Sequence, residues 1–199
     1  MKKTRLSYVV MTVLVLAGIS QAALITNVSR RNSTNPAPAL GGILVDDSLC
    51  MVDRTHVYNQ IPMFLDTAEY VKVSNVDRNV ATYELDITLS ADAYVYLFID
   101  KRIGDGINTD PPLLTSKMTW VAEMGFVDTG FAVAIDESNN GTLDNFGEIY
   151  KGFFKAGTVT LKQQDDGTGR NMYGVAAIPE PMTLSLLALG GLIASRKRS

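Results

Sequence analysis

The sequence predicts an all-β protein whose main part, residues 23–177, is a single jelly-roll-like β-sandwich. Three observations support this fold class. Residues 83–90, YELDITLS, alternate apolar and polar side chains over eight positions. Short apolar runs recur between residues 69 and 176 at roughly 8–12-residue spacing, separated by turn sequences such as GDG at 104–106. No long helical period appears between the two ends of the chain.

The expected strands follow from these patterns in order along the chain. The segment 83–90 places Tyr83, Leu85, Ile87 and Leu89 on one face of a sheet. The segment 93–99 is apolar on both faces, which is typical of a central strand covered on both sides. Further strands are expected at 69–73, 131–135, 148–153, 158–162 and 172–176. The polar stretch 32–38, NSTNPAP, predicts a loop near the domain entrance, with a flexible stalk as the lesser alternative.

The N-terminal 22 residues have the pattern of a signal peptide. Lys2, Lys3 and Arg5 precede an apolar run at 8–19, and small residues stand at Ser20 and Ala22. Cleavage by signal peptidase is expected after Ala22. An uncleaved anchor is the alternative, but the apolar run is shorter than the roughly 20 residues of a membrane span.

The C-terminal 22 residues, 178–199, predict a short transmembrane sorting helix. An apolar run at 182–194 separates the triplet Pro179, Glu180 and Pro181 from the basic residues Arg196, Lys197 and Arg198. Thirteen residues in a helix reach only about 20 Å, against about 30 Å of hydrocarbon, so the anchor is weak. The basic end favours the cytoplasmic side, which places the domain outside.

This arrangement of triplet, apolar helix and basic end resembles the PEP-CTERM sorting signal of Gram-negative bacteria that make exopolysaccharide. The resemblance implies recognition by the membrane enzyme exosortase, transient anchoring in the inner membrane, and transfer to the cell surface or extracellular matrix. Tails of this type also carry the label of an ice-binding protein C-terminal domain.

The middle of the chain resembles β-sandwich accessory modules found beside polysaccharide lyases and related secreted bacterial enzymes. The resemblance lies in the order of short segments, including 94–100, 125–130, 149–150, 156–161 and 172–173. It implies a carbohydrate-binding or supporting role, with extracellular polysaccharide as the partner.

Charge and cysteine content exclude several classes of protein. Residues 23–178 carry 12 Lys or Arg against 20 Asp or Glu, a net charge of -8, so nucleic acid is not an expected partner. Cys50 is the only cysteine, which excludes an intrachain disulfide. Its apolar neighbours Leu49, Met51 and Val52 predict a buried structural thiol.

The segment 136–144, DESNNGTLD, predicts either a calcium loop or an acidic hairpin turn. Asp136, Ser138, Asn140 and Asp144 occupy ligand positions 1, 3, 5 and 9, with Gly141 at position 6. Position 12 is Gly147 in place of the usual acid, and Glu148 comes one residue late. Calcium is therefore the one cofactor that the sequence suggests, and a turn around Asn140 and Gly141 is the alternative.

Three aromatic residues, Tyr94, Tyr96 and Trp120, are candidates for stacking on sugar rings. The alternative is that they belong to a buried central strand and the core. No catalytic motif appears: His56 is the only histidine, and no Gly-x-Ser-x-Gly sequence is present. The sequence therefore favours a non-enzymatic surface or matrix protein with a carbohydrate-binding or structural role. A small secreted carbohydrate-active enzyme and an ice-binding or adhesion protein are the alternatives.

Overall fold

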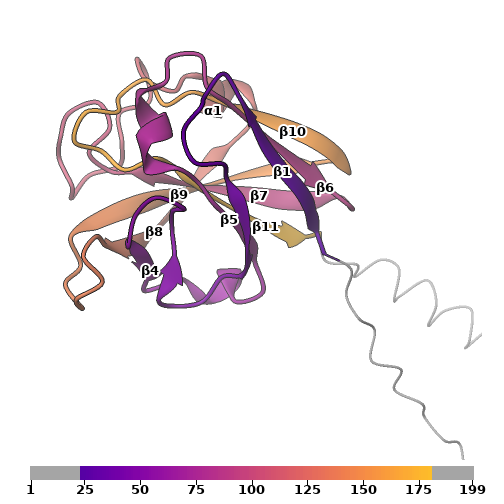
Figure 1. The fold of residues 1–199 in the computed structure, drawn as a ribbon, viewed down its shortest axis with the longest axis horizontal. Coiled ribbons are helices and arrows are strands. Elements are labelled where there is room, and N and C mark those ends of the chain that lie inside the picture. The colour runs from indigo at the N-terminus through magenta and orange to yellow at the C-terminus, as the bar shows by residue number, and fades with distance from the viewer. Residues whose placement is uncertain (1–22, 181–199) are drawn as a thin grey trace, which may run out of the picture.

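The computed structural model describes residues 23–180, and within this range the predicted all-β fold is confirmed. The expected signal peptide, Pro181, the apolar run and the basic end lie outside the described residues. Figure 1 shows a β-rich fold with short helical turns. The strands are β1 (Ile25–Arg31), β2 (Ala39–Ile43), β3 (Ser48–Leu49), β4 (Val57–Asn59), β5 (Glu69–Lys72), β6 (Glu84–Leu89), β7 (Ala93–Asp100), β8 (Val127–Asp136), β9 (Asn145–Phe154), β10 (Gly157–Lys162) and β11 (Gly174–Pro179). The helical segments are η1 (Met63–Leu65), η2 (Asn75–Asn79) and α1 (Trp120–Glu123).

The strands form two sheets in which every pair of neighbouring strands is antiparallel; the isolated bridge between Met51 and Val73 is parallel. The small sheet has the order β1-β6-β10, and the large sheet has the order β2-β5-β11-β7-β9-β8-β4-β3. In Figure 1, β1, β6 and β10 form one layer and β7, β9 and β11 run beneath it. The large sheet curves strongly, because a bridge between Met51 and Val73 brings the region after β3 back to the end of β5. It is therefore nearly closed, like a barrel.

The side chains between the two sheets make the main core. Leu85, Ile87 and Leu89 of β6 are buried, as the alternation in the sequence predicts, while Glu84, Asp86 and Thr88 alternate with them on the other face. Val95, Leu97 and Ile99 of β7 belong to the same core cluster. Each such side chain contributes about 1.5–3 kcal/mol when fully buried, so this face fixes the register of β6 against its neighbours.

A second group of buried residues fills the curve of the large sheet. The Tyr58 ring makes edge contacts with Tyr70 and Phe98, at centroid distances of 6.3 and 5.3 Å. Gly174 is required here, because a Cβ atom would lie 2.0 Å from the Tyr58 hydroxyl oxygen. Cys50 is buried in the same region, and burial raises the pKa of its thiol far above the usual range. The prediction of a buried thiol is confirmed.

The strands expected from the sequence are all present, with shifted ends. Strand β8 starts four residues before the expected 131, and β11 runs to Pro179 rather than ending at 176. The stretch 32–38 is a loop that connects β1 to β2, as expected. Strands β1 to β4 were not expected.

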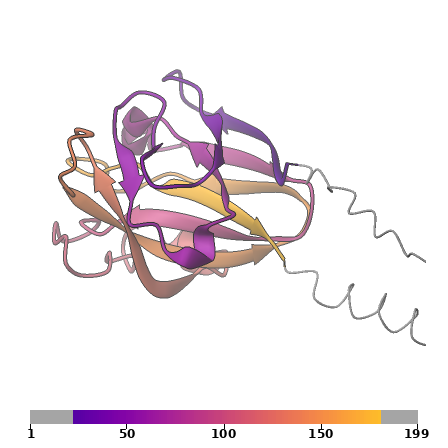
Figure 2. The ribbon, with the colours of Figure 1, turned by 90° about the horizontal axis from the view of Figure 1, so that it is seen from below.

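Both described ends of the chain lie beside the turn between β6 and β7. The Ser90 hydroxyl donates to the carbonyl oxygen of Ala23 at 2.8 Å, and the amide of Glu180 donates to the carbonyl oxygen of Asp92 at 3.0 Å. Figure 2 shows the first and last coloured residues leaving from the same end of the domain. Within residues 23–180, the structure contains no helix with the length and apolar character needed to cross a membrane.

Candidate functional site

The most distinctive exposed feature is a group of aromatic residues on the face of β7, β8 and β9 that points away from the small sheet. We call it the aromatic surface and define it by Phe64, Tyr94, Tyr96, Phe131 and Phe153, with Val127 and Lys151 between them. Phe131, Phe153 and Phe64 are 54, 40 and 39% exposed. Large apolar side chains that gather on a surface in this way mark binding sites more often than isolated ones do.

The pairing of β7 with β9 places the central members of this surface. Tyr94 stands opposite Phe153, and Tyr96 stands opposite Lys151. Directly opposite residues in antiparallel strands share a face and contact each other. Because β-strand side chains alternate, these residues lie on the side opposite to Val95 and Leu97, which point into the core.

A bulge in β8 adds Phe131 to the aromatic surface. Asp128 pairs with Tyr150 and Ala132 pairs with Glu148, so β8 uses four steps where β9 uses two. Gly130 takes a positive φ of 70°, and its amide donates to the Asp128 carboxylate at 2.8 Å. Bulges re-aim side chains, and Phe131 is the last residue of this one before regular pairing resumes at Ala132.

Ring contacts join the aromatic surface to the 3-10 turn η1. The centroid of Phe64 lies 5.3 Å from that of Phe131 and 5.9 Å from that of Tyr96. Tyr94 and Phe153 are 5.5 Å apart in an edge arrangement. The Lys151 ammonium lies 3.7 Å from the centroid of Tyr94, which is cation-π geometry. Tyr96 is only 5% exposed and forms the floor of the surface.

Trp120 does not belong to the aromatic surface, which corrects the predicted group of three. Its side chain is 3% exposed and contacts Phe126 and Tyr173 in the core. The indole N–H donates to the carbonyl oxygen of Gln163 at 2.9 Å. A tryptophan with its ring packed and its one donor satisfied stabilises the fold and has no free face for a ligand.

The segment 136–144 connects β8 to β9 and is closed by its own hydrogen bonds. The Asp136 carboxylate accepts from the amides of Gly141 and Ser138 at 2.6 and 3.1 Å. Asn140 Oδ1 accepts from the amide of Thr142, and Asp144 Oδ2 accepts from the amide of Glu137. Burial alone would raise the pKa of Asp136, but the backbone donors, led by Gly141, lower it.

The missing acid of the calcium pattern is not supplied by Glu148. That residue lies within β9, and its Oε2 atom is 3.0 Å from the Lys101 ammonium. Among residues 23–180, no three His, Cys, Asp or Glu side chains are grouped as a metal site would need. The predicted ligands therefore stand in a hydrogen-bonded turn, and calcium binding stays a prediction.

A titratable cluster that the sequence did not reveal lies on the inner face of β9. Burial raises the pKa of Glu148; Lys101 opposes this shift and Asp128 adds to it. Burial also raises the pKa of Tyr150, with further contributions from Asp128 and Glu148. These residues come together through the bulge in β8 and the turn after β7, which no sequence pattern shows.

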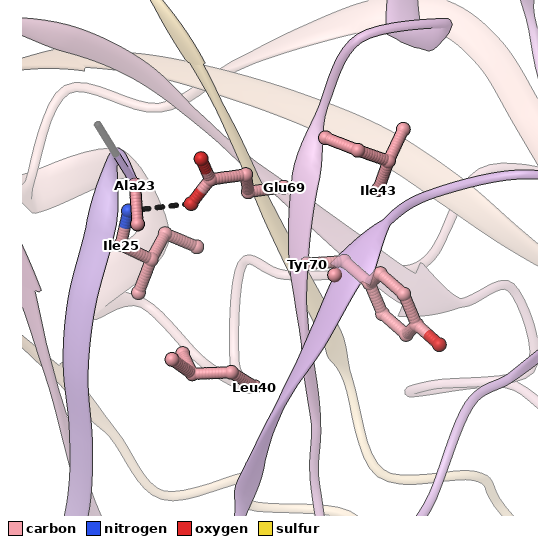
Figure 3. Close-up of a pocket in the computed structure, with 7 residues that line it drawn as sticks. Ala23, Ile25, Leu40, Ile43, Glu69 and Tyr70 are labelled. Atoms are coloured by element: carbon pink, nitrogen blue, oxygen red, sulfur yellow. Dashed lines mark hydrogen bonds between the residues drawn. The ribbon is translucent and has the colours of Figure 1, made fainter. Parts of the chain in front are cut away.

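A cavity of about 260 Å³ lies where the chain enters the domain, between the first residues of β1 and strands β2 and β5. Figure 3 shows Ile25, Leu40 and Ile43 around it, with the Glu69 carboxylate pointing toward the backbone of Ile25. The two carboxylate oxygens accept from the amides of Leu24 and Ile25 at 2.7 and 2.8 Å. The charged group of this cavity is thus already used to hold β1.

The structure describes two residues of the predicted sorting motif, Pro179 and Glu180. Pro179 is the last residue of β11 and stands opposite Ala93 of β7. Pro181, Arg196, Lys197 and Arg198 lie outside the described residues. The described part of the motif is therefore continuous with the large sheet.

The chain is similar in fold to part of a solved enzyme structure. No family model matches the chain, and no curated protein matches it. A solved structure of a β-glucuronidase from glycoside hydrolase family 2 superposes with a TM-score of 0.56 and 14% sequence identity. The match covers 75% of this chain and 14% of that enzyme, so the chain corresponds to a small part of it. The similarity shows a shared β-fold, and at this identity it shows the fold alone.

Proposed function

We propose that this chain is an exported, exosortase-sorted protein of the cell surface or exopolysaccharide matrix that binds polysaccharide without cleaving it. The observation that carries the binding role is the aromatic surface. Phe131, Phe153 and Tyr94 offer partly exposed rings on one face of a sheet. The C–H faces of sugar rings pack well on such rings, and this contact needs no general acid or base.

Two further observations support this proposal. The two sheets share one hydrophobic core, which supports the finer description of the domain as a jelly-roll-like β-sandwich. The part of the β-glucuronidase that it resembles belongs to an enzyme that acts on carbohydrate. Export and sorting rest on the two terminal sequence patterns, and signal peptidase and exosortase are the proposed processing partners.

The binding role is tested by retention of the purified protein on immobilised polysaccharides, with Phe131→Ala and Phe153→Ala as the test variants. Each lost stacking contact should weaken retention by about two- to tenfold, since aromatic contacts contribute roughly 0.5–1.5 kcal/mol beyond area burial. Ile107→Ala is the matched control, because Ile107 is 45% exposed and lies outside the aromatic surface. Equal retention of all three variants would remove the aromatic surface as the binding site.

The same samples separate binding from catalysis. Retention without release of reducing or unsaturated ends is the expected result. The alternative is an enzyme that uses Asp128, an exposed carboxylate near Glu148. Sustained product release that Asp128→Asn abolishes would overturn the non-catalytic proposal.

A further inference from the structure

The aromatic surface contains a cation at its centre. Lys151 lies in the middle of β9, opposite Tyr96 on one neighbouring strand and Val127 on the other. Its ammonium lies 3.7 Å from the Tyr94 centroid. Its direct neighbours across the strands are therefore aromatic or aliphatic, and none is acidic.

Lys151 differs from nearby lysines in its partners. Lys155 pairs with Asp92 at 2.7 Å, and Lys101 pairs with Glu148 at 3.0 Å. In the described range 23–180, no carboxylate lies within 4.0 Å of the Lys151 ammonium. This is notable in a domain where acids outnumber bases by 20 to 12 over residues 23–178. The cation is held by a ring, and its remaining N–H donors have no anion.

The Lys151 ammonium, placed over the Tyr94 ring and beside other exposed rings, is suited to one class of polysaccharide. An ammonium has three donors, and the face of Tyr94 occupies only one side of it. Lys151 and Phe153 are two residues apart on one face of β9, which separates their Cα atoms by about 7 Å. A sugar ring stacked on Phe153 can therefore place a substituent on its edge against Lys151.

We propose that the ligand of the aromatic surface is an acidic polysaccharide whose uronic-acid carboxylates pair with Lys151. This inference rests on the proposed carbohydrate-binding function and adds the chemical class of the ligand. A uronate carboxylate is attached directly to a ring carbon, so it stays at the edge of the stacked ring, within reach of the ammonium. The net negative charge of the domain opposes a polyanion only over a short range, because salt screens charges beyond about 8 Å at physiological ionic strength.

The test measures the affinity of the purified protein for polygalacturonate, dextran and dextran sulfate. Polygalacturonate is the uronate probe, dextran the neutral probe and dextran sulfate the sulfate-ester probe. We expect the tightest binding to polygalacturonate, with an affinity that falls as salt rises from 0.05 to 0.5 M. Lys151→Gln should weaken this binding about tenfold and remove most of its salt dependence, whereas Lys151→Arg should retain both. Lys162→Gln, on the exposed edge of the small sheet, is the matched control and should bind like the unchanged protein.

The possible outcomes separate this inference from the function on which it rests. Equal, salt-independent binding to dextran and polygalacturonate would leave carbohydrate binding in place and overturn the acidic ligand. Tighter binding to dextran sulfate than to polygalacturonate would overturn the uronate assignment. Binding to none of the three, together with Phe131-dependent self-association or vesicle binding, would overturn both proposals. The affinity of Lys151→Gln is compared with that of the unchanged protein only if the two have the same melting temperature, which shows that the variant is folded.

Discussion

At the scale of single residues, Trp120 shows how the neighbours of a side chain decide its role. Its ring contacts Phe126 and Tyr173 and its N–H is satisfied by Gln163. We expect Trp120→Ala to lower the free energy of unfolding by about 3–5 kcal/mol, the usual cost of removing a large core side chain. Urea unfolding gives this value.

The control for this prediction is Phe131→Ala, which removes an exposed ring. It should change the free energy of unfolding much less and retention on polysaccharide much more. The opposite pattern, with Trp120→Ala losing retention at unchanged stability, would return Trp120 to the binding site.

The buried Glu148 carboxyl should make the folded state less stable as pH rises. Burial raises its pKa in the folded protein, so the folded state holds the proton more tightly than the unfolded state. The contribution of Glu148 to the free energy of unfolding is greatest below its pKa in the unfolded chain, about 4.3. This contribution is lost as pH rises through its pKa in the folded protein. The variant Glu148→Gln should not lose stability in this way, because glutamine does not ionise. We expect the variant to gain stability relative to the unchanged protein between pH 4 and 7, measured by urea midpoints; a relative loss over this range would contradict the assignment.

At the scale of elements, the sequence predicts the strands that bury many apolar side chains, β6 on one face and β7 on both. Strand β6 alternates clearly because only one of its faces contacts the core. Strand β1 has a weak pattern, since only Ile25 within it is fully buried. Strand β2 contains Gly41 and Gly42, and a glycine pair in a sequence usually indicates a turn. In the structure Gly41 lies against the Tyr70 ring, where a Cβ atom would not fit. Strands β3 and β4 are too short to show a period.

The residues of the aromatic surface also separate into those that the sequence could predict and those that it could not. Tyr94 and Tyr96 follow from alternation within one strand, so the sequence can propose them. Phe64 and Phe131 join the surface through a contact between the turn η1 and the bulge in β8. Such contacts between distant segments depend on the whole fold, and no local pattern reports them.

The loop 136–144 allows a direct test of its two interpretations. The side chains of Asp136, Asn140 and Asp144 already accept backbone hydrogen bonds, which is what an acidic turn requires. The turn interpretation predicts no change in melting temperature when 1 mM calcium replaces a chelator. A calcium site would instead stabilise the fold by about 2.7 kcal/mol at 100 times the dissociation constant. A shift of several degrees that Asp136→Asn and Asp144→Asn both abolish would establish calcium binding.

At the scale of the whole molecule, the two described ends of the domain lie close together. Ala23 and Glu180 bond to Ser90 and Asp92 on either side of one turn. The aromatic surface starts close to this end, since Tyr94 follows Ala93, which pairs with Pro179. The end of β11 and the first residue of the aromatic surface therefore lie on neighbouring strands at this end of the domain.

The proposed sorting triplet begins inside the last strand of the domain. Pro179 completes β11, and the amide of Glu180 donates to Asp92, so a cut at or beyond Glu180 leaves the large sheet intact. Replacing Pro179, Glu180 and Pro181 with alanines should leave uncut protein in the inner-membrane fraction, because the weak anchor is not removed. The control replaces another acid and two prolines, Asp110, Pro111 and Pro112, with alanines, and should be released normally. If the triplet variant is released as efficiently as the unchanged protein, at equal melting temperature, the triplet is not a sorting signal.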